Sequence, residues 1–126
     1  MRMIASVPQP HPYARRAILY DSGGWGVYVF ACATDEDGSA TGDEWYVSVS
    51  EAIAACQRDY GIQPEDWRII PDPPDGCQDD WIAPVRVRGR VDGNPQWGIL
   101  ERRGPDGVWR EIRKEPDGIW HVVNGE

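Results

Sequence analysis

The sequence has little cysteine and no long hydrophobic run, and each shortage excludes a class of protein. Three cysteines occur in 126 residues, at positions 32, 56 and 77, without CxxC spacing. An odd count of distant cysteines is typical neither of a disulfide framework nor of a zinc site. No apolar run approaches the roughly 20 residues that cross a bilayer. The N-terminus, MRMIASVPQPHPYARR, lacks the apolar segment of a secretory signal, so we expect a cytoplasmic protein without a membrane partner.

Basic residues are scarce in the middle of the chain, where acidic residues are concentrated. From Asp35 to Asp80 there are 13 acidic residues and two basic ones, in a chain whose net charge is −8. Such a segment repels phosphates, so we do not expect nucleic acid to bind, and it attracts a cationic partner or a metal ion. A solvated surface that keeps the protein in solution is the simpler alternative.

Common catalytic motifs are also missing. The chain contains no GxSxG, no HExxH and no phosphate-binding glycine loop. The aspartates of the segment Asp72–Asp80 disfavour the thiolate that Cys77 would need as a nucleophile, and only folding could bring His121 beside it. We therefore expect a non-enzymatic protein with no catalytic residue and no cofactor. A small enzyme or metal-binding protein that uses the Asp72–Asp80 carboxylates is the alternative.

Residues 33–44, ATDEDGSATGDE, resemble a calcium-binding loop in their spacing of oxygen-bearing side chains. The first ligand position, however, is Ala33, and the flanking segments VYVFACA and WYVS are typical of strands, whereas an EF-hand needs helices. We interpret the segment as an acidic hairpin loop rather than a metal site. Its acidic residues are candidates for binding a partner: Asp35, Asp37, Asp43 and Glu44.

The first half of the chain predicts three strands and one helix. ARRAILYD and WGVYVFACA flank a Ser22-Gly23-Gly24 turn, and WYV after the acidic loop returns to the same sheet. Ser48 followed by Glu51 is typical of a capping box, and Gly61 is a helix stop, so we expect a helix at about 49–60. The proline-rich residues 1–13 are expected to form a flexible arm.

The second half predicts only strands. After a short strand at 67–70, strand-like segments cover 82–91, 97–103, 108–113 and 119–123, and a Pro-Asp-Gly turn at 105–107 recurs at 116–118. The predicted class is α+β: an N-terminal three-stranded antiparallel β-meander packed by one helix (about 49–60), followed by a C-terminal antiparallel β-meander. We expect residues 14–126 to be a single domain.

Three arginines alternate with small or apolar residues in the segment VRVRGR. Alternation would place Arg86, Arg88 and Arg90 on one face of a strand. Such a face suits phosphates or a carboxylate-rich partner, because each guanidinium donates in pairs. Pairing within the molecule, with the nearby Asp72–Asp80 segment, is the alternative.

The sequence contains seven tryptophans but only one phenylalanine. Such a ratio predicts that indoles fill much of the core. Because the C-terminal strands carry apolar residues on both faces, one face is also expected to meet the first sheet, a dimer mate or another protein. The candidates for an exposed aromatic platform are Trp97, Trp109 and Trp120.

Together these patterns predict a non-enzymatic protein-binding module whose acidic middle region meets a cationic partner. Charge complementarity speeds encounter, and buried indoles supply affinity. Small acidic inhibitors of basic toxins, the immunity proteins, fit this description by analogy. Pairing with a second copy of the chain, to form a homodimer, is a further alternative for such a surface. The predicted acidic contacts also include Asp79 and Asp80.

Overall fold

The computed structural model describes residues 1–123, which form two compact units. Unit 1 comprises residues 1–35 and 39–72, and unit 2 comprises residues 36–38 together with the chain from Pro73 onward. The boundary between these units lies within PDPPD, where successive prolines and aspartates favour turns over a continuing strand. The acidic middle of the chain is therefore divided between the two units. That residues 14–126 form a single domain stays a prediction.

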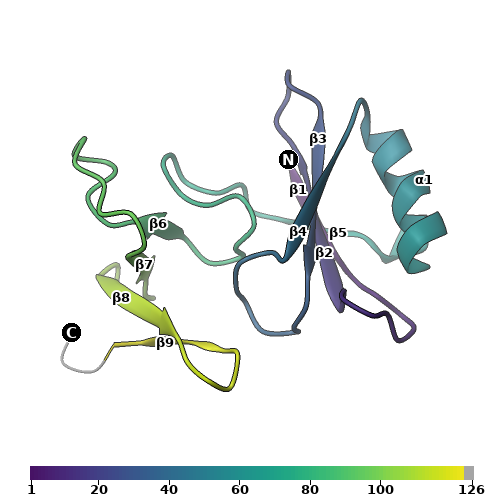
Figure 1. Cartoon of the computed structure of the whole chain (residues 1–126). Coiled ribbons are helices and arrows are strands. Elements are labelled where there is room, and N and C mark those ends of the chain that lie inside the picture. Colours follow the sequence, from purple (N-terminus) through teal and green to yellow (C-terminus); the bar gives the residue numbers. More distant parts are fainter. Residues whose placement is uncertain (124–126) are drawn as a thin grey trace. The chain divides into compact units, whose positions relative to one another are not determined.

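Unit 1 consists of a five-stranded antiparallel sheet and one α-helix (Figure 1). The strand order is β4-β3-β2-β1-β5, so β2, β3 and β4 pair in sequence order and the predicted N-terminal meander is confirmed. β3, which is apolar on both faces, lies inside the sheet as expected. The elements are β1 (Arg2–Ser6), β2 (Arg16–Asp21), β3 (Val27–Cys32), β4 (Gly42–Tyr46), α1 (Val49–Tyr60), the 3-10 turn η1 (Pro64–Asp66) and β5 (Arg68–Ile70).

Residues 1–13 were expected to form a flexible arm, and this prediction is wrong for the first half of the segment. β1 pairs with β2 and β5, and its Ile4 is buried against Ile18 and Ile70. The terminal amino group of Met1 lies 3.2 Å from an Asp72 carboxylate oxygen. Burial of an apolar strand residue and two ladders of hydrogen bonds outweigh the entropy of ordering so short a segment. The prolines instead lie in the connection between β1 and β2.

The helix at 49–60 is confirmed, with both ends as the sequence indicates. The Ser48 hydroxyl accepts a hydrogen bond from the Glu51 amide at 3.2 Å, and Gly61 has a φ of 70°, the left-handed geometry that glycine adopts at a C-cap. Cys56 of α1 packs with Leu19 and Val29 in the core between helix and sheet. Burial raises the pKa of the Cys56 thiol to about 12, so this cysteine stays protonated and acts as a small apolar residue.

Unit 2 is built on a four-stranded antiparallel sheet in the order β6-β7-β8-β9, which confirms the predicted C-terminal meander. Three of its four strands are shorter than predicted, whereas β8 keeps the predicted length and is displaced by one residue. The expected strand at 82–91 reduces to three residues, because Gly89, with a φ of 78°, turns the chain. The strands are β6 (Val85–Val87), β7 (Leu100–Arg103), β8 (Trp109–Lys114) and β9 (Trp120–Val122).

The two Pro-Asp-Gly segments form the same turn. Asp106 accepts a hydrogen bond from the Val108 amide at 3.0 Å, and Asp117 accepts one from the Ile119 amide at 2.8 Å. In both turns the side chain four residues after the aspartate contacts its other oxygen, Arg110 at 2.7 Å and His121 at 3.0 Å. The repeat in the sequence is therefore a repeat of hairpin geometry.

Tryptophan fills less of the core than predicted. Of the seven tryptophans, all within the described residues, Trp81 alone is fully buried, and its ring meets Trp120 edge-on at 5.4 Å. In unit 1 the residues between helix and sheet include Ala17, Ala31 and Ala52. Such small side chains let the helix approach closely, and the half-buried Trp67 packs against this core. The half-buried indoles are Trp67, Trp109 and Trp120, and the exposed ones are Trp25, Trp45 and Trp97.

Candidate binding site

The predicted acidic loop does not form one site. Asp35 pairs with Arg15 at 2.9 Å in unit 1. Asp37 belongs to unit 2, where its two oxygens accept hydrogen bonds from the Ile82 and Ala83 amides, both at 2.8 Å. Asp37 therefore holds the chain beside Trp81 and is a structural residue. Within residues 1–123, no group of three or more His, Cys, Asp or Glu side chains is arranged to hold a metal ion.

The second acidic segment and its cysteine lie in unit 2. Asp79 and Asp80 are half-buried and precede the core residue Trp81. Cys77 is buried in a turn in which its amide donates to the Pro74 carbonyl at 3.0 Å. His121, which the sequence offered as a partner for Cys77, contacts Asp117 instead.

The arginine segment pairs within the molecule, but with other carboxylates than expected. Arg86 and Arg88 contact the two oxygens of Glu101 at 2.7 and 3.2 Å, and Arg88 also reaches Glu111 at 3.2 Å. Glu101 is only 6% exposed. Pairing within the molecule is thus made with Glu101 and Glu111, because β6 lies beside β7 and antiparallel register places Arg86 opposite Glu101. Arg90 leaves the shared face, since the turn at Gly89 interrupts the alternation.

The three candidate platform tryptophans do not share a surface. Trp109 lies under the guanidinium of Arg86, whose central carbon is 3.8 Å from the ring centroid. Trp120 packs against the core residue Trp81. Trp97 is 73% exposed and lies before β7. Trp109 and Ile112 are an odd number of residues apart in β8, so they point to opposite faces of the sheet.

The remaining two predicted residues, Asp43 and Glu44, lie together on β4. Within the described residues β4 is hydrogen-bonded to β3 alone, so it is an edge of the sheet. Gly42, Asp43, Glu44 and Trp45 are all exposed. An edge strand has backbone N–H and C=O groups on its outer side that can pair with another extended chain.

Two exposed indoles lie at one end of β4. Trp25, in the turn between β2 and β3, is 82% exposed, and Trp45 is 52% exposed. The Trp45 indole donates a hydrogen bond to the Trp25 carbonyl at 2.7 Å. The Trp45 ring lies against Gly26, where any side chain would collide with it. Sequence reasoning missed this pair, although the glycines on both sides of Trp25 indicate a turn that exposes it.

A small cavity of about 80 Å³ adjoins the other end of β4. The Glu44 carboxylate accepts hydrogen bonds from the hydroxyls of Tyr46 and Tyr60. Burial, together with the charge of Glu44, raises the pKa of both phenols above the ordinary value of 10, so both remain donors. The walls include Tyr13, Tyr60, Glu44, Val29, Ala31 and Gly42.

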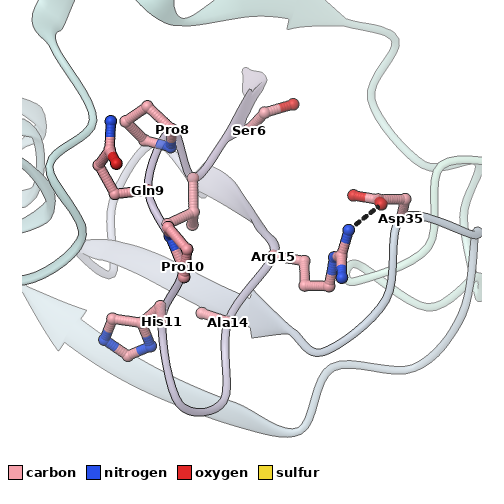
Figure 2. Close-up of a pocket in the computed structure, with 9 residues that line it drawn as sticks. Ser6, Pro8, Gln9, Pro10, His11, Ala14, Arg15 and Asp35 are labelled. Carbon is pink, nitrogen blue, oxygen red and sulfur yellow. Dashed lines mark hydrogen bonds and ion pairs between the residues drawn. The ribbon is translucent and has the colours of Figure 1, made fainter.

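A larger cavity of about 340 Å³ lies within the connection between β1 and β2. Figure 2 shows Arg15 directed toward Asp35 on one side, with Pro8, Pro10 and His11 along the loop. The His11 ring also meets Tyr60 edge-on, with centroids 5.1 Å apart. This histidine therefore joins the proline loop to the aromatic wall of the smaller cavity.

No family model, curated protein or solved structure matches this chain. Within residues 1–123, no helix is long and apolar enough to span a bilayer. The candidate site therefore rests on its own geometry: an exposed edge strand with two carboxylates, an indole pair at one end and an acidic, aromatic cavity at the other.

Proposed function

We propose that this protein is a non-enzymatic binding module that takes up an extended, cationic segment of another protein along β4. The observation that carries the proposal is the exposure of Gly42–Trp45 at the edge of a sheet. An incoming strand gains affinity from backbone hydrogen bonds and specificity from alternate side chains. The other edge strand, β5, has only three residues, and short edges resist such pairing.

The charge of the site favours a cationic occupant. β4 carries Asp43 and Glu44, and the neighbouring α1 adds Glu51 and Asp59 against a single basic residue, Arg58. Arg58 is already paired with Asp59 at 2.8 Å. A second copy of β4 would bring carboxylates against carboxylates, which is destabilising in a strand pair. A lysine- or arginine-bearing strand meets opposite charges instead.

The indole pair supplies the apolar part of the contact. Trp25 and Trp45 both have exposed side chains, and the Trp45 indole is held in place by its hydrogen bond to the Trp25 backbone carbonyl and by contact with Gly26. A rigid aromatic group loses little conformational entropy on binding, which is why tryptophan is frequent among the residues that dominate interfaces. Small acidic inhibitors of basic toxins are related to this proposal by analogy only.

The proposal is tested with two synthetic strand-length peptides of about 5–6 residues, in which valine alternates with lysine or with glutamate. We expect the lysine peptide to shift the NMR amide signals of residues 42–46 and to leave residues 68–70 unmoved. Addition of salt should weaken this binding. Equal binding of both peptides, or no shift at 42–46 at millimolar lysine peptide, contradicts the proposal.

Charge reversal on β4 is the complementary test. Asp43→Lys should lower the affinity for the lysine peptide severalfold, because it reverses a charge on the strand beside which the peptide lies, within about a Debye length of its lysines. Glu65→Lys, an equal change at an exposed residue of η1, is the matched control and should have a much smaller effect. Asp37 is unsuitable for this test, because its loss would disturb the turn at Ile82 and Ala83. Equal losses in the two variants would mean that the peptide responds only to net charge.

A further inference from the structure

We infer that the cavity beside Glu44 is a pocket for one basic side chain, a lysine or arginine of the segment bound along β4. This inference rests on the proposed function and specifies which residue of the partner is recognised. The pocket combines a carboxylate with two phenol rings, those of Tyr13 and Tyr60. A cation is attracted both to a carboxylate and to the face of an aromatic ring, so the three groups act on the same ligand.

The carboxylate of Glu44 is held in place before any ligand binds. Tyr46 donates to one of its oxygens and Tyr60 to the other, the latter at 3.4 Å. Tyr60 is 6% exposed and belongs to the core of unit 1, so its position is set by packing. Each carboxylate oxygen can accept more than one hydrogen bond, and Glu44 therefore keeps acceptor capacity for an incoming cation. A group positioned in advance loses less entropy on binding.

The pocket has room for the end of one side chain. Its volume is about 80 Å³, which is enough for an ammonium or guanidinium group to enter. Tyr13 is 57% exposed, so its side of the pocket is open to an approaching side chain.

Strand register connects the pocket with the indole pair. Glu44 lies opposite the core residue Val29 and so faces α1, whereas Trp45 lies opposite Tyr28 on the other face of the sheet. Successive residues of a strand bound beside β4 also alternate between these faces. The preferred segment therefore places a basic residue toward Glu44 and, next to it, an apolar residue toward Trp45.

The inference is tested by a double-mutant cycle with two peptides: the lysine peptide used above, and the same peptide with glutamine at its central lysine. We expect Glu44→Gln to lower the affinity for the lysine peptide about tenfold. The glutamine peptide should bind wild type and Glu44→Gln with equal affinity. Glu65→Gln removes an equal charge away from the pocket and should change the affinity less than about twofold. Thermal melts of each variant show whether the fold is retained.

The aromatic wall has its own test. Tyr13→Leu removes an exposed ring, and we expect a severalfold loss of affinity for the lysine peptide without a change in melting temperature. Tyr60→Phe keeps the ring and removes only the hydroxyl that contacts Glu44, so a smaller loss is expected.

The outcomes separate the two proposals. If the lysine peptide shifts residues 42–46 but Glu44→Gln and Tyr13→Leu bind it as wild type does, the pocket is not used and the edge-strand proposal stands. If the lysine peptide does not bind wild type at β4 at all, both proposals are wrong.

Discussion

Unit 1 buries one helix against a five-stranded sheet, whereas unit 2, over its described residues, has a four-stranded sheet and no helix of its own. The core of unit 1 includes Leu19, Val29, Ala52 and Cys56 among many small and aliphatic side chains. The core of unit 2 is concentrated on Trp81, with Val85 and Ile112 beside it. One unit thus distributes its apolar burial over many residues, and the other depends on one large side chain.

The two units also differ in their polar contacts, and here unit 2 has a network of paired charges. In unit 2 the face of the sheet turned away from Ile112 carries Glu101 and Glu111, which Arg86 and Arg88 bridge, and Arg86 also covers Trp109. A charged network of this kind covers the second face of the sheet but must keep all its partners, since a buried carboxylate left unpaired is costly. The comparison indicates that a small sheet is completed by paired charges where apolar residues are few.

The largest effect is expected from Trp81→Ala. Removing a buried tryptophan side chain costs about 3–5 kcal/mol, which we expect to unfold unit 2 and leave unit 1 folded. Amide NMR spectra would then lose the dispersed signals of residues 73–123 and retain those of β2, β3 and α1. Trp97→Ala, at a 73% exposed position, is the control and should change stability by about 0.5 kcal/mol or less. Loss of both sets of signals would mean that the two units fold as one.

The second-largest loss of stability is expected from Glu101→Gln. Glu101 is 6% exposed and contacts two arginines, so its loss should destabilise unit 2 by about 1–3 kcal/mol. This loss of stability is well below that expected from breaking a deeply buried ion pair, because Arg86 and Arg88 are partly exposed to solvent. Denaturant unfolding followed by tryptophan fluorescence measures the change. Glu115→Gln, at an exposed position, serves as the control, and equal effects of the two variants would refute the role of the network.

Ser48→Ala tests the helix that distinguishes unit 1. The Ser48 hydroxyl caps the Glu51 amide, and loss of such a cap costs about 1 kcal/mol. Ser50→Ala changes the same residue type within α1 and should cost much less, since alanine is a better helix former. Hydrogen exchange of α1 amides reports the difference, which should be confined to unit 1.

The smallest effect concerns the first Pro-Asp-Gly turn of unit 2. The guanidinium of Arg110 and the Val108 amide lower the pKa of Asp106 from 3.8 to about 2. A carboxyl whose folded-state pKa is depressed adds stability at neutral pH, and this contribution is lost as pH falls from about 4 toward 2. Asp106→Asn should therefore be less stable than wild type at neutral pH, and the difference should vanish at the acid end of that window.

Direct titration checks the cause of this pKa. Arg110→Gln should move the pKa of Asp106, followed by carbon NMR of its carboxyl group, upward toward the ordinary value. An unchanged titration in this variant would exclude Arg110 as the main cause.

Local patterns identified most of the elements. Ser48 and Gly61 bound the helix, and the glycines and Pro-Asp-Gly segments marked turns, because capping and positive φ depend on residues next to each other in the chain. Strand β1 escaped prediction because its stability comes from pairing with β2 and with β5, which is more than sixty residues away. Strand ends also shifted where Gly89 turned the chain.

The candidate site was only partly foreseeable. Asp43 and Glu44 remained candidates in the structure, while Asp35 and Asp37 separated to form contacts in different units. All four side chains are carboxylates of the same acidic segment, so a count of charges does not distinguish the two that remained candidates from the two that did not. The exposed indoles proved to be Trp25, Trp45 and Trp97, so only one of the three candidates in the C-terminal meander is exposed, because exposure depends on which face of a strand meets the core.

The sequence by itself determined the α+β class, the helix Val49–Tyr60 with its caps Ser48 and Gly61, and the repeated hairpin turns, since each follows from interactions over a few residues. The tertiary structure decided which charges are satisfied and which are exposed. Arg86 and Arg88 meet Glu101 across neighbouring strands, and β4 lies at an edge with Glu44 beside Tyr13 and Tyr60. Strand order brings these residues together from distant positions, and no local rule of composition or spacing specifies that order.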